Sequence, residues 1–335
     1  MNRREFLKLS LTLAIGGFVM TTEAAEKFSR IDFHAHAILP SYVDALKILK
    51  IDAAAEEGFP LPKWSAQAHL QFMADAGIDF TILSMATPHI SDCAAVRAIN
   101  EEFAALCKKY PDKFGFVATL PLPNVEGSIE EFYFATEKLG ALGVKVASNS
   151  DGIYLGDERL DPIFAELDRK NSLVIIHPSP ARTLPRGNVV TGKVMALFEY
   201  PADTTRAVLN LLANGTLEKF PNLKFVVPHC GSFLPYMKQR AGAMFQMLAA
   251  MNLMEQVNFT ASLEKLFFGT AGDPMPEQFD ILLKIASLDQ IIFGTDYPYV
   301  PAQVVLRKKK LFDAELTKRG LTAKIYVDNA KLLLG

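Results

Sequence analysis

The chain has 335 residues, of which 50% are hydrophobic and 21% are charged, and its formal net charge is -2. These values are ordinary for a globular protein and exclude disordered, collagen-like and strongly basic nucleic-acid-binding chains. The basic run Arg307–Lys310 is interpreted as the solvated face of a late helix, so no nucleic-acid partner is expected. Three cysteines are too few for a disulfide framework.

The N-terminus has the three parts of an export signal: a basic start, an apolar run and small residues. The pair Arg3-Arg4, followed by Phe6, Leu7 and Lys8, resembles the twin-arginine signal. The apolar run of about 12 residues is shorter than the about 20 that a membrane-spanning helix needs. We therefore expect residues 1–25 to be a cleaved signal peptide. Residues 26–335 are then a periplasmic domain, exported folded, with no stable membrane insertion; an uncleaved anchor is the alternative.

Short apolar runs recur along the mature chain, and each is followed by a helical pattern. The runs occupy residues 31–36, 80–86, 114–122, 144–148, 173–178, 224–229, 266–270 and 291–298. Continuous apolar runs of this length suit strands that are buried on both faces of a parallel sheet. Eight strand–helix repeats predict an α/β protein with a single (β/α)8 TIM barrel. A doubly wound sheet is the alternative, but no G-x-G-x-x-G follows the first run.

The segments between these runs carry helix signals. In residues 201–221, Asp203 is predicted to cap a helix, whose end is predicted at Gly215. Most of the surplus length lies in residues 38–64, which are punctuated by prolines and are interpreted as an insertion after the first strand. In a barrel this insertion would lie over the C-terminal face, as a lid or a substrate wall.

Potential metal ligands and proton carriers gather at the predicted C-terminal ends of the strands, where barrel enzymes keep their chemistry. The first run carries His34 and His36, which share one face of a strand because they are two residues apart. The fifth, sixth and eighth runs carry His177, His229 and Asp296. Chance clustering is a poor explanation for so many ligands at one rim.

These residue types suit a borderline divalent ion, for which zinc is expected and manganese is the alternative. We interpret His34, His36, His177 and Asp296 as metal ligands. His229 is interpreted as an acid/base residue beside the metal, because imidazole titrates near neutral pH. Taken alone, His177 would be read as a buried structural histidine about as readily as a ligand.

Five segments resemble the decarboxylase branch of the amidohydrolase superfamily, which includes the aminocarboxymuconate-semialdehyde, 6-methylsalicylate and γ-resorcylate decarboxylases. The segments are IDFHAHAI, LSMATPHI, IIHP, FPNLKFVVPHCGSFLPYMKQR and IIFGTDYP. The resemblance implies a (β/α)8 barrel with one divalent metal at the four ligands named above and His229 as the catalytic histidine. Arg240 matches an arginine that binds substrate carboxylate and can reach a neighbouring subunit's site, which implies a homodimer. Cys230 stands where the branch usually has glycine.

The expected reaction is the metal-dependent, non-oxidative decarboxylation of an aromatic (hydroxybenzoate-type) or muconate-type carboxylic acid. The metal would hold the substrate carboxylate with an adjacent oxygen, and His229 or Asp296 would deliver a proton to the carbon that loses CO₂. Arg240, and less strongly Arg182 or Arg186, is expected to pair with a carboxylate.

Two alternatives remain open. The first is a metal-dependent hydrolase of a lactone, ester or amide, in which the same metal site would activate water and His229 or Asp296 would act as the base. Many hydrolases of the superfamily hold two metal ions bridged by a carbamylated lysine. Lys145 lies on the fourth run but short of its end. The second alternative is a periplasmic binding protein with a vestigial site. One metal ion per subunit would favour the decarboxylase, and two would favour the hydrolase.

Overall fold

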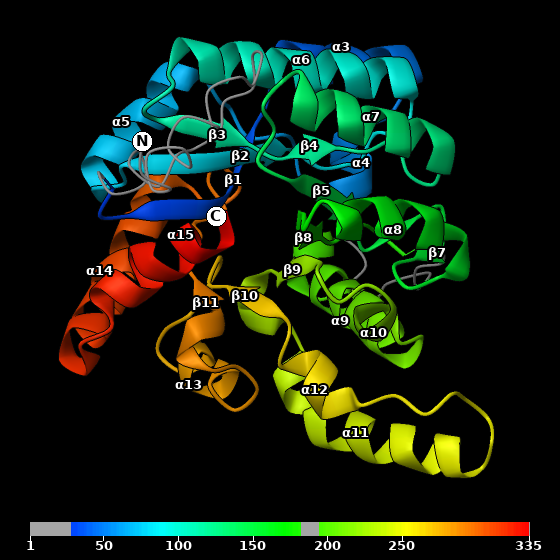
Figure 1. Cartoon of the computed structure of the whole chain (residues 1–335). Coiled ribbons are helices and arrows are strands. Elements are labelled where there is room, and N and C mark those ends of the chain that lie inside the picture. The colour runs from blue at the N-terminus through cyan, green and yellow to red at the C-terminus, as the bar shows by residue number, and fades with distance from the viewer. Residues whose placement is uncertain (1–27, 182–193, 335) are drawn as a thin grey trace, which may run out of the picture.

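The structure is a computed structural model that describes residues 28–181 and 194–334. Short strands lie at the centre of the molecule, and helices surround them (Figure 1). The expected signal peptide, Arg182 and Arg186 lie outside the described residues. Within the described ranges, no helix is both long and apolar enough to cross a membrane.

Each of the predicted strand runs contains a strand. The strands of the barrel are β1 (Ile31–Ala37), β2 (Phe80–Met85), β3 (Phe114–Phe116), β4 (Ala118–Thr119), β5 (Val144–Ala147), β8 (Leu173–His177), β9 (Lys224–Val227), β10 (Phe267–Gly269) and β11 (Ile291–Ile292). A small antiparallel hairpin of β6 (Asn149–Ser150) and β7 (Ile153–Tyr154) follows β5 and was not predicted. It lies outside the barrel.

The barrel consists of two parallel sheets that close on each other. One sheet has the order β1-β2-β3, and the other has the order β11-β10-β9-β8-β5-β4. Val117, between β3 and β4, donates from its backbone to Leu83 at 3.0 Å, which joins the sheets on one side. On the other side, the backbone N–H of His36 donates to the Tyr297 carbonyl at 2.8 Å. The predicted TIM barrel is thereby confirmed.

The first strand changes its inward face halfway along. Ile31 and Phe33 belong to the cluster that fills the barrel, whereas Ala35 and Ala37 belong to the larger cluster between the barrel and its helices. The register of β1 against β2 shifts between Asp32 and Ala35, so the alternation of side chains restarts within the strand. This irregularity allows apolar residues to fill the bottom of the barrel and the histidines that follow to face its interior.

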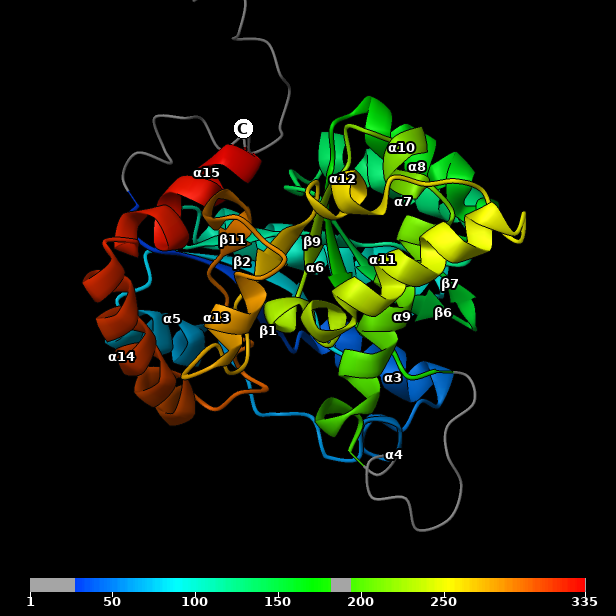
Figure 2. The ribbon, with the colours of Figure 1, turned by 90° about the horizontal axis from the view of Figure 1, so that it is seen from below.

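Helices cover the outside of the barrel and alternate with its strands (Figures 1 and 2). They are α3 (Pro40–Leu49), α4 (Ala53–Glu57), α5 (Ala66–Ala76), α6 (Cys93–Lys109), α7 (Val125–Glu137), α8 (Asp161–Arg169), α9 (Glu199–Ala213), α10 (Thr216–Lys219), α11 (Leu234–Ala250), α12 (Phe259–Leu263), α13 (Gln278–Leu282), α14 (Ala302–Arg319) and α15 (Asn329–Leu334). Local signals explain several of their ends. For example, Ser65 caps α5 at its start, and Gly77 ends it in a left-handed conformation.

The predicted start of α9 was wrong. The helix begins at Glu199, four residues before Asp203, and the Asp203 side chain is buried within the helix instead of capping it. Its carboxylate accepts hydrogen bonds from Asn149 at 2.8 Å and from Arg206 at 2.7 Å. Asn149, which follows β5, and Arg206 on α9 itself therefore satisfy this aspartate, and the contact with Asn149 depends on tertiary structure that local sequence does not reveal.

Residues 38–64 form α3 and α4 after the first strand, and α4 lies beside the start of α9 (Figure 2). Asp52 caps α4 by accepting from the Ala55 N–H at 3.1 Å, and Gly58 ends it with φ +81°. Glu57, the last residue of α4, is buried and receives a hydrogen bond from the Tyr200 hydroxyl. The segment thus reaches the C-terminal side of the barrel; its origin as an insertion stays a prediction.

Candidate metal centre and active site

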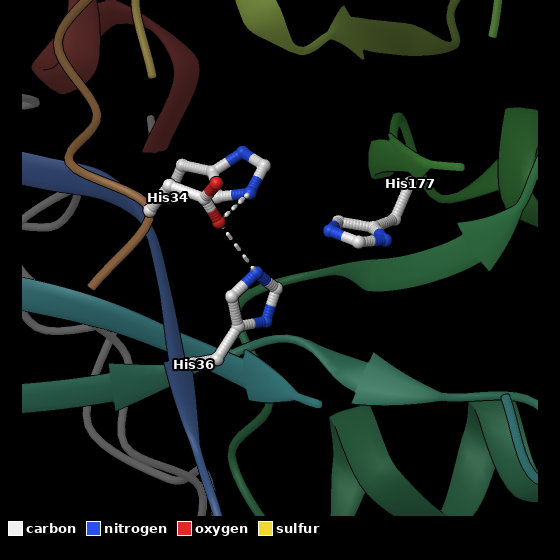
Figure 3. Close-up of side chains that lie close together, drawn as sticks. His34, His36 and His177 are labelled. Carbon is white, nitrogen blue, oxygen red and sulfur yellow. Dashed lines mark ion pairs between the residues drawn. The ribbon is translucent and has the colours of Figure 1, made fainter. Parts of the chain in front are cut away.

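Three histidines and one aspartate converge at the C-terminal end of the barrel. His34 and His36 come from β1, His177 from the end of β8 and Asp296 from the turn after β11. One ligand atom from each residue lies within 4.8 Å of every other. Figure 3 shows the His34 and His36 rings beside each other and His177 facing them from the opposite strand. The structure therefore brings together the four residues predicted from the sequence as ligands.

The buried histidines of the cluster are neutral, and in His36 and His177 the unprotonated nitrogen is Nε2. His36 Nδ1 lies 3.1 Å from the Met85 carbonyl, and His177 Nδ1 lies 3.1 Å from the Pro178 carbonyl. A carbonyl oxygen only accepts, so each Nδ1 carries the proton and each Nε2 has a free lone pair. Burial lowers the pKa of His36 to about 3 and places those of His34 and His177 below the usual value. Neutral imidazole is the form that binds metals.

Asp296 supplies the negative charge. Its Oδ1 lies 3.5 Å from His34 Nε2 and 3.2 Å from His36 Nε2. Burial by itself would raise the pKa of Asp296, but its contacts with His229, His34 and His36 outweigh burial and hold the pKa well below the usual value. The Nε2 atoms of His34 and His36 are buried and have no hydrogen bond of good geometry within the described residues. Unsatisfied buried nitrogens around a carboxylate fit a divalent metal ion.

His229 lies beside this cluster but outside the ligand set. Its Nε2 is 3.7 Å from Asp296 Oδ2, and its ring centroid is 5.2 Å from that of His34. His229, Cys230 and Ser232 have φ values of +53°, +52° and +54°, and Asp296 has +63°. Left-handed backbone is uncommon for residues other than glycine and is concentrated at functional sites. The Cys230 backbone adopts the left-handed conformation that glycine favours.

A cavity of about 510 Å³ opens above the cluster. His177, His229 and Asp296 line its inner part, and Phe59, Tyr200 and Tyr299 line its walls. The Tyr299 ring lies edge-on to that of His36, with centroids 5.3 Å apart. A cavity of this size with aromatic walls and a few polar groups is typical of a small-molecule site.

Two of the residues considered from the sequence lie elsewhere or have other partners. Arg240 lies on α11, is exposed and does not line the cavity of its own subunit. Lys145 is buried on β5, and its ammonium group donates to the Met85 carbonyl, which is also the partner of His36. Within the described residues, the cluster of His34, His36, His177 and Asp296 accounts for the only candidate metal site.

Sequence reasoning missed two buried acids at this site. Asp32 accepts from the backbone N–H of His34 at 3.0 Å and from the Thr295 hydroxyl at 2.6 Å. Glu57 lines the cavity and accepts from Tyr200. The position of Asp32, two residues before His34, was a usable signal. For Glu57 none was present, because its place depends on how α4 packs against α9.

The comparisons with known proteins identify the family. A family model described as Amidohydrolase matches residues 31–335. The chain belongs to the amidohydrolase family. A solved structure described as an amidohydrolase II is 33% identical in sequence, covers 91% of this chain and 99% of its own, and superposes with a TM-score of 0.84.

Several relatives of this amidohydrolase are named as decarboxylases of aromatic acids. The 6-methylsalicylic acid decarboxylase of Penicillium expansum is 28% identical over 87% of this chain and 93% of its own. A 5-carboxyvanillate decarboxylase of Novosphingobium aromaticivorans, solved with manganese and 4-hydroxy-3-methoxy-5-nitrobenzoic acid, is 22% identical. It covers 92% of this chain and 96% of its own, with a TM-score of 0.79, and shares the fold. The predicted resemblance to the decarboxylase branch is confirmed.

Proposed function

We propose that this amidohydrolase is a metal-dependent, non-oxidative decarboxylase of an aromatic, hydroxybenzoate-type or a muconate-type carboxylic acid. The observation that carries the proposal is the geometry of the cavity. Neutral imidazoles and one carboxylate lie at its inner end, with His229 beside them and aromatic rings along its walls. Relatives across most of the chain length are named decarboxylases of such acids.

The proposed roles follow from these positions. A divalent ion held by His34, His36, His177 and Asp296 would supply Lewis-acid polarisation and orientation of the substrate's oxygen atoms. His229 lines the cavity and would give a proton to the ring or chain carbon that carries the carboxylate. The bond to the carboxylate then breaks, CO₂ leaves, and the electron pair of that bond restores the conjugated system. The reaction needs no oxidant and no organic cofactor.

We expect the metal to be zinc. Three imidazoles and one carboxylate form a donor set that suits zinc, and manganese is the alternative because carboxylate ligands also suit that ion. Metal analysis of protein purified without added metal, together with activity regained by each ion after removal, distinguishes them. One zinc per chain supports this assignment, and full activity with manganese alone contradicts it.

A homodimer is proposed to complete the site with Arg240. This arginine lies on α11, whose Tyr236 is 88% exposed, and Met251 just beyond the helix is 58% exposed. Exposed large apolar side chains on the same helix as an arginine that has no ion pair with any described residue suit contact with a second copy. If Arg240 reaches the partner's cavity, mixing Arg240→Ala with His229→Ala subunits restores about a quarter of the activity, because half of the dimers are mixed and each has one intact site. Absence of any restoration contradicts the shared site.

Export through the twin-arginine route is proposed from Arg3 and Arg4. The full-length chain, expressed in a bacterium, is expected in the periplasmic fraction without its first 25 or so residues. Replacing both arginines with lysine is expected to retain the protein in the cytoplasm. Equal distribution of the two forms would contradict the route.

The reaction itself is tested with a panel of acids. Metal-loaded protein is incubated with hydroxybenzoic acids and muconate semialdehydes while CO₂ release is followed, and lactones are included and scored for ring opening. Release of CO₂ from at least one acid supports the proposal. Lactone opening with no CO₂ from any acid would identify a hydrolase instead.

A further inference from the structure

Glu57 places a carboxyl group in the wall of the cavity, although the expected substrate is itself an acid. Its residue surface is 1% exposed, and it lines the same cavity as His177, His229 and Asp296. The caps at Asp52 and Gly58 fix the short helix α4 that carries it.

Only one of the two oxygen atoms of Glu57 has a hydrogen-bond partner. Oε2 accepts from the Tyr200 hydroxyl, whereas Oε1 is buried and accepts no hydrogen bond from any described residue. Burial raises the pKa of Glu57 to about 7, and the hydrogen bond from Tyr200 together with the nearby Thr87 side chain opposes this rise. A buried acceptor without a donor is costly, and a ligand donor in the cavity would remove that cost.

The neighbouring hydroxyl groups on this wall have partners already. Tyr299 donates to the Thr87 carbonyl at 2.9 Å and accepts from the Thr87 backbone N–H at 3.0 Å. The Tyr200 hydroxyl donates to Glu57 itself. Glu57 Oε1 therefore has no donor among the described residues, and neither does the Ser232 hydroxyl, which also lines the cavity. Phe59 and Tyr299, whose ring centroids are 5.9 Å apart, line the same cavity as Glu57.

We propose that Glu57 is a specificity-determining residue. Its Oε1 accepts a hydrogen bond from a hydroxyl or amino group on the substrate ring, at a position away from the carboxylate that is lost. This inference rests on the proposed decarboxylase function and narrows its substrate class. The preferred substrates are aromatic monocarboxylic acids with such a distal donor. Acids with a second carboxylate at that position are disfavoured, because two carboxylates would face each other in a poorly hydrated space.

The test pairs changes in the enzyme with changes in the substrate. The substrates are 2-hydroxybenzoic acid, the dihydroxybenzoic acids that keep its 2-hydroxyl group, and matching acids with a second carboxylate. The enzymes are the wild type, Glu57→Gln, Glu57→Leu and the control Glu56→Gln. Glu56 is exposed and does not line the cavity, so its change removes one charge from the same helix without altering the wall.

For wild type and Glu56→Gln, one dihydroxybenzoic acid is expected to have a kcat/KM at least tenfold above that of 2-hydroxybenzoic acid. Glu57→Leu removes the acceptor and is expected to lose this advantage, so that its kcat/KM values for that dihydroxybenzoic acid and for 2-hydroxybenzoic acid become equal. Glu57→Gln keeps an acceptor but removes the charge, so it gains activity toward the acid with a second carboxylate. Equal preferences in all four enzymes would overturn the proposal.

Calorimetric binding of the same acids to the metal-loaded proteins separates this inference from the reaction. If no acid releases CO₂ from the wild type, the proposed reaction fails, but the role of Glu57 is still decided by the dissociation constants. A distal hydroxyl that tightens binding to wild type and not to Glu57→Leu supports that role. An equal effect in both overturns it. Thermal melting and metal content, measured for each variant, show whether a lost preference reflects misfolding.

Discussion

Asp32 and Thr295 connect the two edges at which the barrel closes. The Thr295 hydroxyl donates to Asp32 Oδ2 at 2.6 Å, and the Thr295 backbone N–H donates to Oδ1 at 3.1 Å. Asp32 also holds the backbone of His34, and Thr295 directly precedes Asp296. The pair therefore sets the distance between two proposed metal ligands that come from opposite ends of the chain.

Replacing Asp32 with alanine is expected to weaken metal binding without removing a ligand. Three hydrogen bonds disappear, and partners that orient metal ligands typically contribute a factor of about 10 to 100 in affinity. Chelator competition measures the change. Asp79→Asn, an aspartate near the opposite end of the barrel that binds Ser29, is the control. Unchanged affinity in Asp32→Ala would show that the ligands are held by other contacts.

Removing a ligand is expected to abolish both metal binding and turnover. His34→Ala deletes one imidazole, and Asp296→Asn replaces the only carboxylate of the cluster with a neutral amide. Metal content and CO₂ release should fall together in each variant. Full turnover in either one would remove these residues from the proposed centre.

His229→Asn separates proton transfer from metal binding. Because His229 lies outside the ligand cluster, the variant should keep its metal. Loss of an acid/base group typically lowers kcat by a factor of about 10² to 10⁴. The informative measurement is kcat alongside metal content. A variant that retains metal and wild-type kcat would exclude the acid/base role.

The predictions from sequence were most accurate where chemistry follows strand ends. His34, His36, His177 and Asp296 converge as expected, since parallel strands end at one rim. The prediction that His34 and His36 share one face assumed regular alternation along β1 and omitted its register shift. Because of this shift, both histidines and Phe33 can point into the barrel.

Residues whose environment comes from distant segments escaped prediction. Asp203 was predicted to cap a helix, but its buried carboxylate accepts a hydrogen bond from Asn149, which follows β5. Glu57 lies in the segment 38–64, which was predicted as a lid or substrate wall, but the sequence did not indicate its contact with Tyr200 of α9. Neither fact follows from local propensity or periodicity, because tertiary packing overrides both.

The pH dependence of stability offers a test independent of the metal. His69 is buried, its Nδ1 accepts from the Trp64 indole N–H at 3.0 Å, and burial lowers its pKa from 6.5 to about 3. Between these values the unfolded chain binds a proton that the folded chain does not. The free energy of unfolding therefore falls by about 1.4 kcal/mol for each pH unit of acidification, through this residue alone.

The comparison of wild type with His69→Gln isolates this contribution. Urea unfolding is measured from about pH 6 to about pH 4.5. Over this range the free energy of unfolding of the wild type should fall more steeply than that of the variant, by up to about 1.4 kcal/mol per pH unit. The histidines of the metal centre contribute equally to both proteins and cancel in the difference. Parallel curves would mean that His69 is protonated in the folded protein.

Metal-dependent CO₂ release tests the central proposal most directly. Purified protein is assayed with its best hydroxybenzoic acid as isolated, after removal of metal by a chelator, and after addition of one equivalent of zinc per chain. We expect one CO₂ per acid consumed, loss of turnover on chelation and recovery at one equivalent. Turnover that survives complete removal of metal, or that requires two ions per chain, would contradict the proposed decarboxylase centre.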